Sequence, residues 1–345
     1  MSHLPQRKEK DCLNCRTEVI GKFCHNCGQE NIEPKETVWH LISHFFRDIT
    51  HFDGKFFTSL KVLILKPGFL SKEYINGRRA SYLNPVRMYL FTSALFFIIF
   101  FSLYSVNPND LNKNITFWGK NVDEIEKLDS AQLRDFTIKM NNGKPMTREE
   151  LNARMDSVTG FHLTPKKYKS RQEYDSLIKS GAKKHNWIQK QLVYKNFDLK
   201  EKYGSNGRII LAALLNKFMH YLPQMLFVLL PLFALILKLI YIRRKQFFYV
   251  DHIIFTIHLY IFIFLIMLIT FGISKLNALL DWGWLKYLVI IFILSIFFYF
   301  YKALRNFYKQ RRAKTIFKYF ILLFLFFITT LFMFIIFFFS SILVL

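Results

Sequence analysis

The sequence predicts an all-α integral membrane protein: a five-helix transmembrane bundle with a small four-cysteine domain at its N-terminus. The first observation behind this prediction is how the apolar residues are distributed. Of the 345 residues, 52% are hydrophobic and 40 are Phe, and these residues gather in long blocks, which is typical of membrane spans. The second observation is that all 4 cysteines lie within the first 27 residues.

The cysteines form two CxxC motifs separated by eight residues: Cys12, Cys15, Cys24 and Cys27. Each motif can turn two thiolates toward one ion, and four sulfurs complete a tetrahedral zinc site with no open position. Gly28, directly after the second motif, suits the left-handed backbone that such a turn needs. We therefore predict a structural, cytoplasmic zinc ribbon over residues 1–32, with Zn²⁺ as its cofactor.

Two other interpretations of the cysteines stay open, a redox-active dithiol and disulfide bonds. A redox CxxC motif normally lies at a strand–helix junction of a βαβ unit, a context that this sequence lacks. Disulfides are rare in the cytoplasm, where we expect this segment to lie. His25 is adjacent to the second motif but is surplus to a site filled by four thiolates.

Residues 37–66 are predicted to form an amphipathic juxtamembrane helix. Aromatic and branched apolar residues recur there mostly at spacings of three or four: Trp39, Ile42, Phe45, Phe46, Ile49, Phe52, Phe56 and Phe57. Such a helix, just before a basic cluster and a span, can lie in the membrane interface or dock against the bundle.

Three histidines on one face of that helix form a candidate second site: His40, His44 and His51. Imidazoles at i and i+4 can converge on one metal ion or on the iron of a haem. The alternative is that they are polar residues at the boundary of the apolar stripe.

Five apolar segments are long enough, or nearly so, to cross about 30 Å of hydrocarbon as helices. They are residues 88–106, 218–242, 253–273, 285–301 and 319–345. Residues 67–106 thus comprise a basic linker and the first span, and residues 218–345 form a four-helix transmembrane region. The last span has almost no small residues for close helix packing, so we expect it to face lipid.

Lys and Arg flank alternate ends of these spans. They cluster before the first span, at residues 243–245 and at residues 302–318, and the positive-inside rule makes these ends cytoplasmic. The N-terminus is then cytoplasmic, the C-terminus extracytoplasmic, and residues 107–217 form an extracytoplasmic loop domain. That domain is expected to be mostly helical, with helices at residues 121–140, 147–157 and 171–195.

The formal charge of +24 is concentrated beside the apolar blocks. Anionic lipid headgroups account for that placement, so a bilayer with such headgroups is the expected partner and no nucleic acid is expected. Within the spans, Asp251 and His258 are seven residues apart and share a helix face. Ionisable groups in a span are candidate functional residues, although an ion pair of Asp251 with residues 243–245 is an adequate alternative.

A series of short motifs follows the cysteines and leads into the first span: Phe56-Phe57-Thr58, Pro67-Gly68, Tyr74-Ile75, Gly77-x-Arg79, Tyr82 and Pro85. Together with the ribbon, this order resembles a family of uncharacterised bacterial membrane proteins, domain of unknown function 3667, over roughly residues 10–105. The resemblance implies a multi-pass protein of the cell inner membrane and supplies no catalytic residues. Arg16 departs from the glycine that such ribbons often carry after the first motif.

The sequence shows no convergent set of catalytic residues, and whether the protein is an enzyme stays open. A membrane-anchored interaction or assembly protein, with a cytoplasmic protein partner bound through the ribbon, fits a closed metal site best. A small transporter or permease component is one alternative, based on the span count and on Pro223 and Pro231 in the second span. A membrane enzyme using the histidine face for metal or haem is another.

Overall fold

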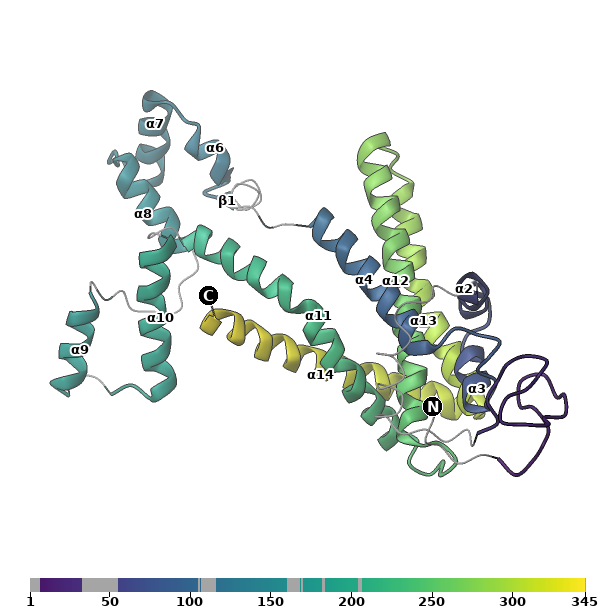
Figure 1. The fold of residues 1–345 in the computed structure, drawn as a ribbon. Helices are drawn as coiled ribbons and strands as arrows, with labels where there is room; N and C mark the ends of the chain where they lie inside the picture. The colour runs from purple at the N-terminus through teal and green to yellow at the C-terminus, as the bar shows by residue number, and fades with distance from the viewer. Residues whose placement is uncertain are drawn as a thin grey trace. The chain divides into compact units, whose positions relative to one another are not determined.

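The computed structural model describes residues 7–32, 55–104, 106, 116–159, 168, 170–181, 184–203 and 207–344 (Figure 1). The chain divides into two compact units. The first unit comprises Met1–Leu103 with Leu226–Phe332, and the second comprises Tyr104–Met225 with Met333–Leu345.

The described residues contain five helices long and apolar enough to cross a membrane, which confirms the predicted fold class. They are α4 (Pro85–Leu103), α11 (Gly207–Ile240), α12 (Tyr249–Leu280), α13 (Leu285–Tyr308) and α14 (Arg312–Val344). Helices α12, α13 and α14 extend into polar flanks beyond the apolar segments. Helix α11 begins at Gly207 rather than at residue 218, because Asn216 and Lys217 interrupt the apolar run without ending the helix, which continues through the apolar residues 209–215.

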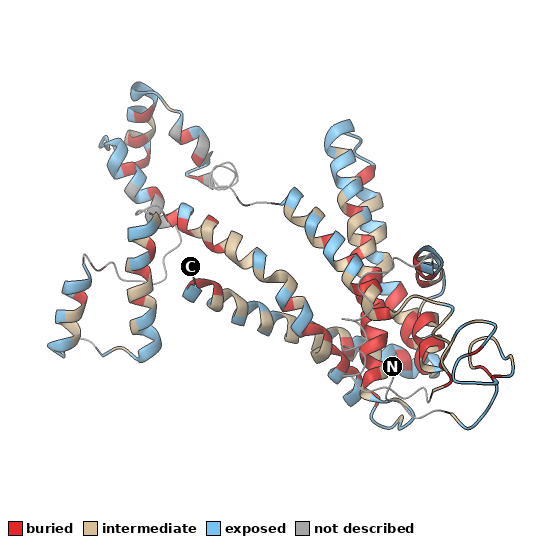
Figure 2. Cartoon of the chain, in the orientation of Figure 1, coloured by how far each residue is buried: buried red, intermediate tan, exposed pale blue. Residues whose placement is uncertain are grey.

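Helix α12 is the centre of the first unit. It packs against α4, α13 and two shorter helices, α2 (Lys55–Leu65) and α3 (Phe69–Ile75), and most of its apolar stretch is buried (Figure 2). By contrast, very little of the apolar stretch of α14 is buried, and Phe320 and Phe324 are exposed. Such a surface is unfavourable in water, so α14 is suited to face lipid.

The turn between α2 and α3 is held by side chains of α13. Tyr299 Oη donates a hydrogen bond to the carbonyl of Leu63 at 2.9 Å, and Asn306 Nδ2 donates to that of Pro67 at 2.9 Å. Gly68 has φ 75°, and a Cβ there would lie 2.7 Å from the carbonyl oxygen of Ala303. Only glycine permits both this conformation and this contact.

The described part of the predicted juxtamembrane helix is α2, which belongs to the bundle. Phe56 and Leu63 are buried in the same core as α4 and α12, whereas Phe57 is exposed. This observation favours docking against the bundle for residues 55–65. Residues 37–54 of the predicted helix lie outside the described residues.

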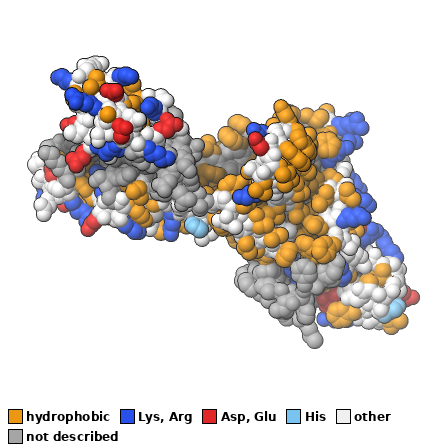
Figure 3. Space-filling model, turned by 90° about the horizontal axis from the view of Figure 1, so that it is seen from above, with side chains coloured by type: hydrophobic (Ala, Val, Ile, Leu, Met, Phe, Trp, Pro, Cys, Tyr) orange, Lys and Arg blue, Asp and Glu red, His pale blue; other side chains and the backbone are white. Residues whose placement is uncertain are grey.

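Several helix ends meet at one end of the first unit. Lys318 Nζ donates to the carbonyl of Ile240 at 2.9 Å, which joins the start of α14 to the end of α11. His252 Nδ1 lies 2.6 Å from Tyr308 Oη, which joins the start of α12 to the end of α13. The basic segments therefore share this end, and Lys and Arg side chains gather along one flank of the apolar body in Figure 3.

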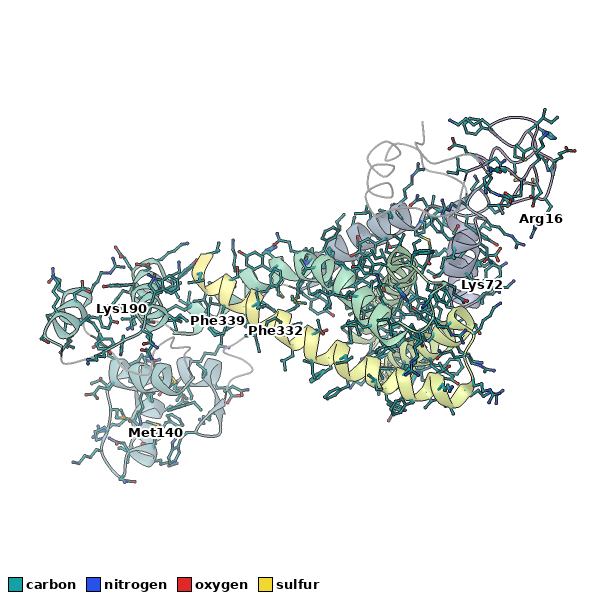
Figure 4. The ribbon with its side chains drawn as sticks, turned by 90° about the horizontal axis from the view of Figure 1, so that it is seen from below. Arg16, Lys72, Met140, Lys190, Phe332 and Phe339 are labelled. Carbon is teal, nitrogen blue, oxygen red and sulfur yellow. The ribbon has the colours of Figure 1, made fainter. Side chains whose placement is uncertain are left out.

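The second unit contains the first part of α11, the end of α14, a set of short helices and one small hairpin. The hairpin and short helices are β1 (Thr116–Phe117), β2 (Lys120–Asn121), α6 (Val122–Glu126), α7 (Ser130–Met140), α8 (Arg148–Thr159), α9 (Arg171–Lys179) and α10 (Trp187–Tyr203). Two expected helices are interrupted, by a capping box at Asp129 and by Gly181 at φ 73°. Met140 (labelled in Figure 4) and Met155 lie in a small core of this unit.

Candidate metal centre and polar contacts of the first unit

The four cysteine sulfurs lie within 4.8 Å of one another. Sγ of Cys12 is 3.5 Å from that of Cys27, and Sγ of Cys15 is 3.5 Å from that of Cys24. A tetrahedral ion with metal–sulfur bonds of about 2.3 Å holds its sulfurs about 3.8 Å apart. The four groups are free thiols, and their geometry fits one metal ion bound by all four.

The two CxxC motifs form equivalent turns. The N–H groups of Arg16 and Gly28 donate to the carbonyls of Cys12 and Cys24, each at 2.9 Å. Arg16 has φ 68° and Gly28 has φ 72°, so both residues have left-handed backbone. Arg16, labelled in Figure 4, therefore gives the first turn the same backbone conformation as Gly28 gives the second.

Short antiparallel bridges connect the flanks of each turn. Asp11 pairs with Glu18, and Phe23 pairs with Glu30. The buried apolar part of the ribbon consists of Val19 with two of the cysteines. Because a core this small cannot offset the entropy of ordering the chain, we expect the ribbon to fold only with metal bound.

Two of the thiols have shifted pKa values. Hydrogen bonds from the hydroxyl and the backbone N–H of Thr17 stabilise the Cys15 thiolate and lower its pKa to about 6. Burial disfavours the charged form of Cys27 and raises its pKa to about 11. The charged form of Cys15 is therefore favoured over that of Cys27, and a metal ion held by all four sulfurs would bind each of them as a thiolate. His25 is exposed and lies outside the cysteine cluster.

The ribbon is attached to the loop between α3 and α4. Gln29 Nε2 donates to the carbonyl of Gly77 at 2.6 Å, and its Oε1 accepts from the N–H groups of Arg79 at 3.2 Å and Ala80 at 3.1 Å. Ser81 Oγ donates to Asn14 Oδ1 at 2.6 Å. We call this set of contacts the ribbon latch. Both cysteine turns take part in it, since Asn14 lies in the first and Gln29 follows the second.

The structure describes one of the two other predicted sites, the pair Asp251 and His258, but not the three histidines. The candidate histidines His40, His44 and His51 lie outside the described residues. Asp251 Oδ2 accepts from the N–H of Phe248 at 2.7 Å, so it caps α12. No ion pair joins Asp251 to residues 243–245 within the described parts of the chain.

His258 is buried in α12, only 4% exposed. Its Nδ1 lies 3.0 Å from Ser71 Oγ and 3.0 Å from the carbonyl of Ile254. Asp251 and His258 thus share a helix face but contact different groups. The contact with Ser71 ties α3 to the interior of the bundle.

Sequence reasoning missed two further polar contacts near the same end. His252 is buried beside Tyr308, and Arg78 Nη1 lies 2.7 Å from the buried carboxylate of Glu73. The pairing of Glu73 with Arg78 could have been suspected, because opposite charges five residues apart bracket Gly77. His252 and Tyr308 are too far apart in the chain for any local pattern to join them.

The comparisons with known proteins agree with the expected family. The family described as "Protein of unknown function (DUF3667)" matches residues 53–97, so the resemblance is confirmed over that segment. The matched residues include α2, α3, the latch loop and most of α4. Neither a curated protein nor a solved structure matches the chain.

Proposed function

We propose that this multi-pass membrane protein, whose residues 53–97 match a family of unknown function, is a membrane-anchored interaction or assembly protein. Its ribbon serves as the docking surface for a cytoplasmic protein. The observation that carries this proposal is the exposure of two large apolar side chains on the ribbon, Ile20 at 89% and Phe23 at 56%. The ribbon buries its cysteines and Val19 but leaves these two larger side chains outside.

The ribbon latch supports this role because it fixes the ribbon to the bundle. A ribbon joined only by a flexible segment would have to be ordered when a partner binds, at a cost in entropy. Hydrogen bonds between Gln29 and three backbone groups of the latch loop attach the domain that carries the exposed Ile20 and Phe23 to the bundle. A partner docked there would be positioned relative to the membrane spans.

Zinc is the metal that best fits this site. Four thiolates with no open position form the usual structural zinc site, and soft sulfur ligands select against hard cations such as Mg²⁺. We expect one zinc equivalent per purified chain and its loss in Cys24→Ser, measured by elemental mass spectrometry. A second equivalent lost in His44→Ala would instead favour the metal-enzyme hypothesis.

The orientation that we propose places the ribbon in the cytoplasm of a cell whose inner membrane holds the spans. The support is the collection of basic segments at the ribbon end of the first unit, including Arg243, Arg244 and Lys245. Cytoplasmic ends carry such residues because of the positive-inside rule and anionic headgroups.

Site-specific photo-crosslinking in cells tests the docking proposal. A photoreactive residue in place of Ile20 should give a discrete protein adduct, and Phe23→Ser should weaken that adduct by removing apolar contact area. The same residue in place of Ile188, which is 64% exposed in the second unit, is the control. Adducts with lipid alone, or the same protein adduct at both positions, would contradict the proposal.

A further inference from the structure

A groove of about 1150 Å³ runs along α13 beside the turn between α2 and α3. It lies wholly within the first unit, and the proposed docking role of the ribbon makes no use of it. One end is apolar, and its lining includes Phe262 and Ile266 of α12 and Ile291 and Phe292 of α13. Ile291 is 59% exposed, so this end is open to the surroundings of the span.

The other end of the groove is basic. Its cations come from the α2–α3 segment and from the last turns of α13: Lys66, Lys72, Lys302, Arg305 and Lys309. No acidic residue lines the groove, and no carboxylate pairs with these five cations in the part of the chain that the structure describes. Lys72, on α3, is labelled in Figure 4.

Two of the five cations lie over aromatic rings of the groove lining. Lys66 Nζ lies 5.2 Å from the ring centre of Phe69, and Lys302 Nζ lies 5.5 Å from that of Phe298. Several like charges gathered around one hollow repel one another and attract a multivalent or strongly acidic anion. Phosphate oxygens are well suited to Arg and Lys donors.

The groove has the dimensions of a lipid in one leaflet. From Ile291 to Arg305 the helix rises about 21 Å, at about 1.5 Å per residue. Half of a hydrocarbon core is about 15 Å thick, so a molecule in the groove extends from headgroup level to near the middle of the bilayer. Charge lies only at the headgroup end, which matches the polarity of a phospholipid.

We propose that this groove binds one anionic phospholipid. The phosphate of the headgroup contacts Lys302 and Arg305 of α13 and Lys72 of α3, and an acyl chain lies along the apolar end toward Ile291. A free phosphate ion would use the basic end but would leave the apolar end unfilled, so the structure favours the lipid. The bound lipid would bridge α3 and α13, the same elements that are joined at Gly68 and Ala303.

The test is native mass spectrometry of the full-length chain in detergent with added lipid. Phosphatidylglycerol should bind with one site per chain, and phosphatidylcholine with the same acyl chains should bind at least about tenfold more weakly. The double variant Lys302→Gln with Arg305→Gln should lose about tenfold in affinity for phosphatidylglycerol. Its matched control is Arg312→Gln with Lys314→Gln, two exposed cations of the adjacent segment that do not line the groove, and it should bind as the parent does.

A second pair of variants tests the apolar end without changing any charge. Ser295 lines the groove, and Ser295→Trp should block the acyl chain and reduce binding by about tenfold. Leu294→Trp places the same side chain on a position that is 59% exposed and outside the groove, so it should bind normally. An unchanged helical circular dichroism spectrum checks that each variant is folded.

Three results would overturn the proposal. The first is equal binding of phosphatidylglycerol and phosphatidylcholine. The second is parent-like affinity in both groove variants. The third is displacement of the lipid by millimolar inorganic phosphate together with unchanged binding in Ser295→Trp, which would indicate a site for free phosphate. None of these results depends on whether the ribbon has a protein partner.

Discussion

Arg16 and Gly28 occupy equivalent positions after the two CxxC motifs and share the same left-handed backbone. A side chain in this region costs about 1 kcal/mol or more, whereas glycine adopts it freely. We expect Arg16→Gly to tighten metal binding and Gly28→Ala to weaken it, each by about 1 kcal/mol or roughly fivefold. The readout is competition with a chromophoric chelator, because metal affinity and ribbon folding are linked.

The pair of substitutions isolates the backbone contribution. A Cβ at Gly28 would meet no heavy atom within 4 Å, so a steric clash cannot explain weaker binding in Gly28→Ala. Arg16 is paired with Asp11 at 3.6 Å, but both side chains are exposed, and such pairs contribute little. Tighter binding in both variants, or weaker binding in both, would show that backbone conformation is not the deciding factor.

Gly68 is the residue at which backbone conformation and helix packing coincide. Gly68→Ala would strain the backbone at φ 75° and place a Cβ 2.7 Å from the carbonyl oxygen of Ala303. We expect a loss of stability of roughly 2 kcal/mol or more, measured as the unfolding midpoint of the full chain in detergent. Gly272→Ala is the control, since a Cβ there would have open space and α12 has ordinary helical backbone. A comparable loss in both variants would refute this explanation.

Individual residues of the metal centre could be predicted from the sequence, but their partners could not. The spacing of the four cysteines is local and follows from ligand geometry, so it identified the cluster directly. Ser71 and His258 are 187 residues apart, and nothing in a single sequence joins them. The left-handed conformation of Arg16 could not be predicted from the sequence either, because non-glycine residues seldom adopt it.

Among the elements, the ribbon latch makes the clearest prediction. Gln29→Ala removes one hydrogen bond to the carbonyl of Gly77 and two from the N–H groups of Arg79 and Ala80. At about 1 kcal/mol per hydrogen bond, hydrogen exchange of these two amides should become at least about tenfold faster, while the metal is retained. Hydrogen–deuterium exchange mass spectrometry of the latch loop, with metal content measured in parallel, provides the readout.

The control for the latch is Asn26→Ala. It removes a hydrogen bond of 3.1 Å from Asn26 to Thr17, which lies inside the ribbon and does not involve the latch loop. Exchange of Arg79 and Ala80 should stay slow in this variant. If Gln29→Ala left their exchange unchanged, the ribbon would not be held to the bundle in solution by these contacts.

The long apolar helices were the most predictable elements, and the short ones were the least. A span can be recognised from its uninterrupted apolar run. Its helix, however, continues through charged residues, as in the last turns of α13 beyond residue 301. Helix α3 has only seven residues, too few for a periodic pattern. The β1–β2 hairpin is shorter still and turns through Trp118 and Gly119, both at positive φ.

At the scale of the whole molecule, the distribution of charge makes the last prediction. The starts of α12 and α14, the ends of α11 and α13, and the ribbon share one end of the first unit. Basic segments before α4, at residues 243–245 and at residues 302–318 therefore lie together, and from the positive-inside rule we predict that this end is cytoplasmic. The described residues contain five candidate spans, an odd number, so we predict that the two termini lie on opposite sides of the membrane.

Reporter fusions in cells check this topology. A fluorescent protein that matures only in the cytoplasm should be active at the N-terminus, and alkaline phosphatase, which needs an oxidising compartment, should be active at the C-terminus. Protease added to spheroplasts should cleave the chain between α9 and α10, because the loop domain is expected outside. The ribbon, which is expected on the other side of the membrane, should stay uncleaved. An N-terminal phosphatase fusion that is active would place the cysteines in an oxidising compartment, where disulfides become favourable and a thiolate zinc site does not.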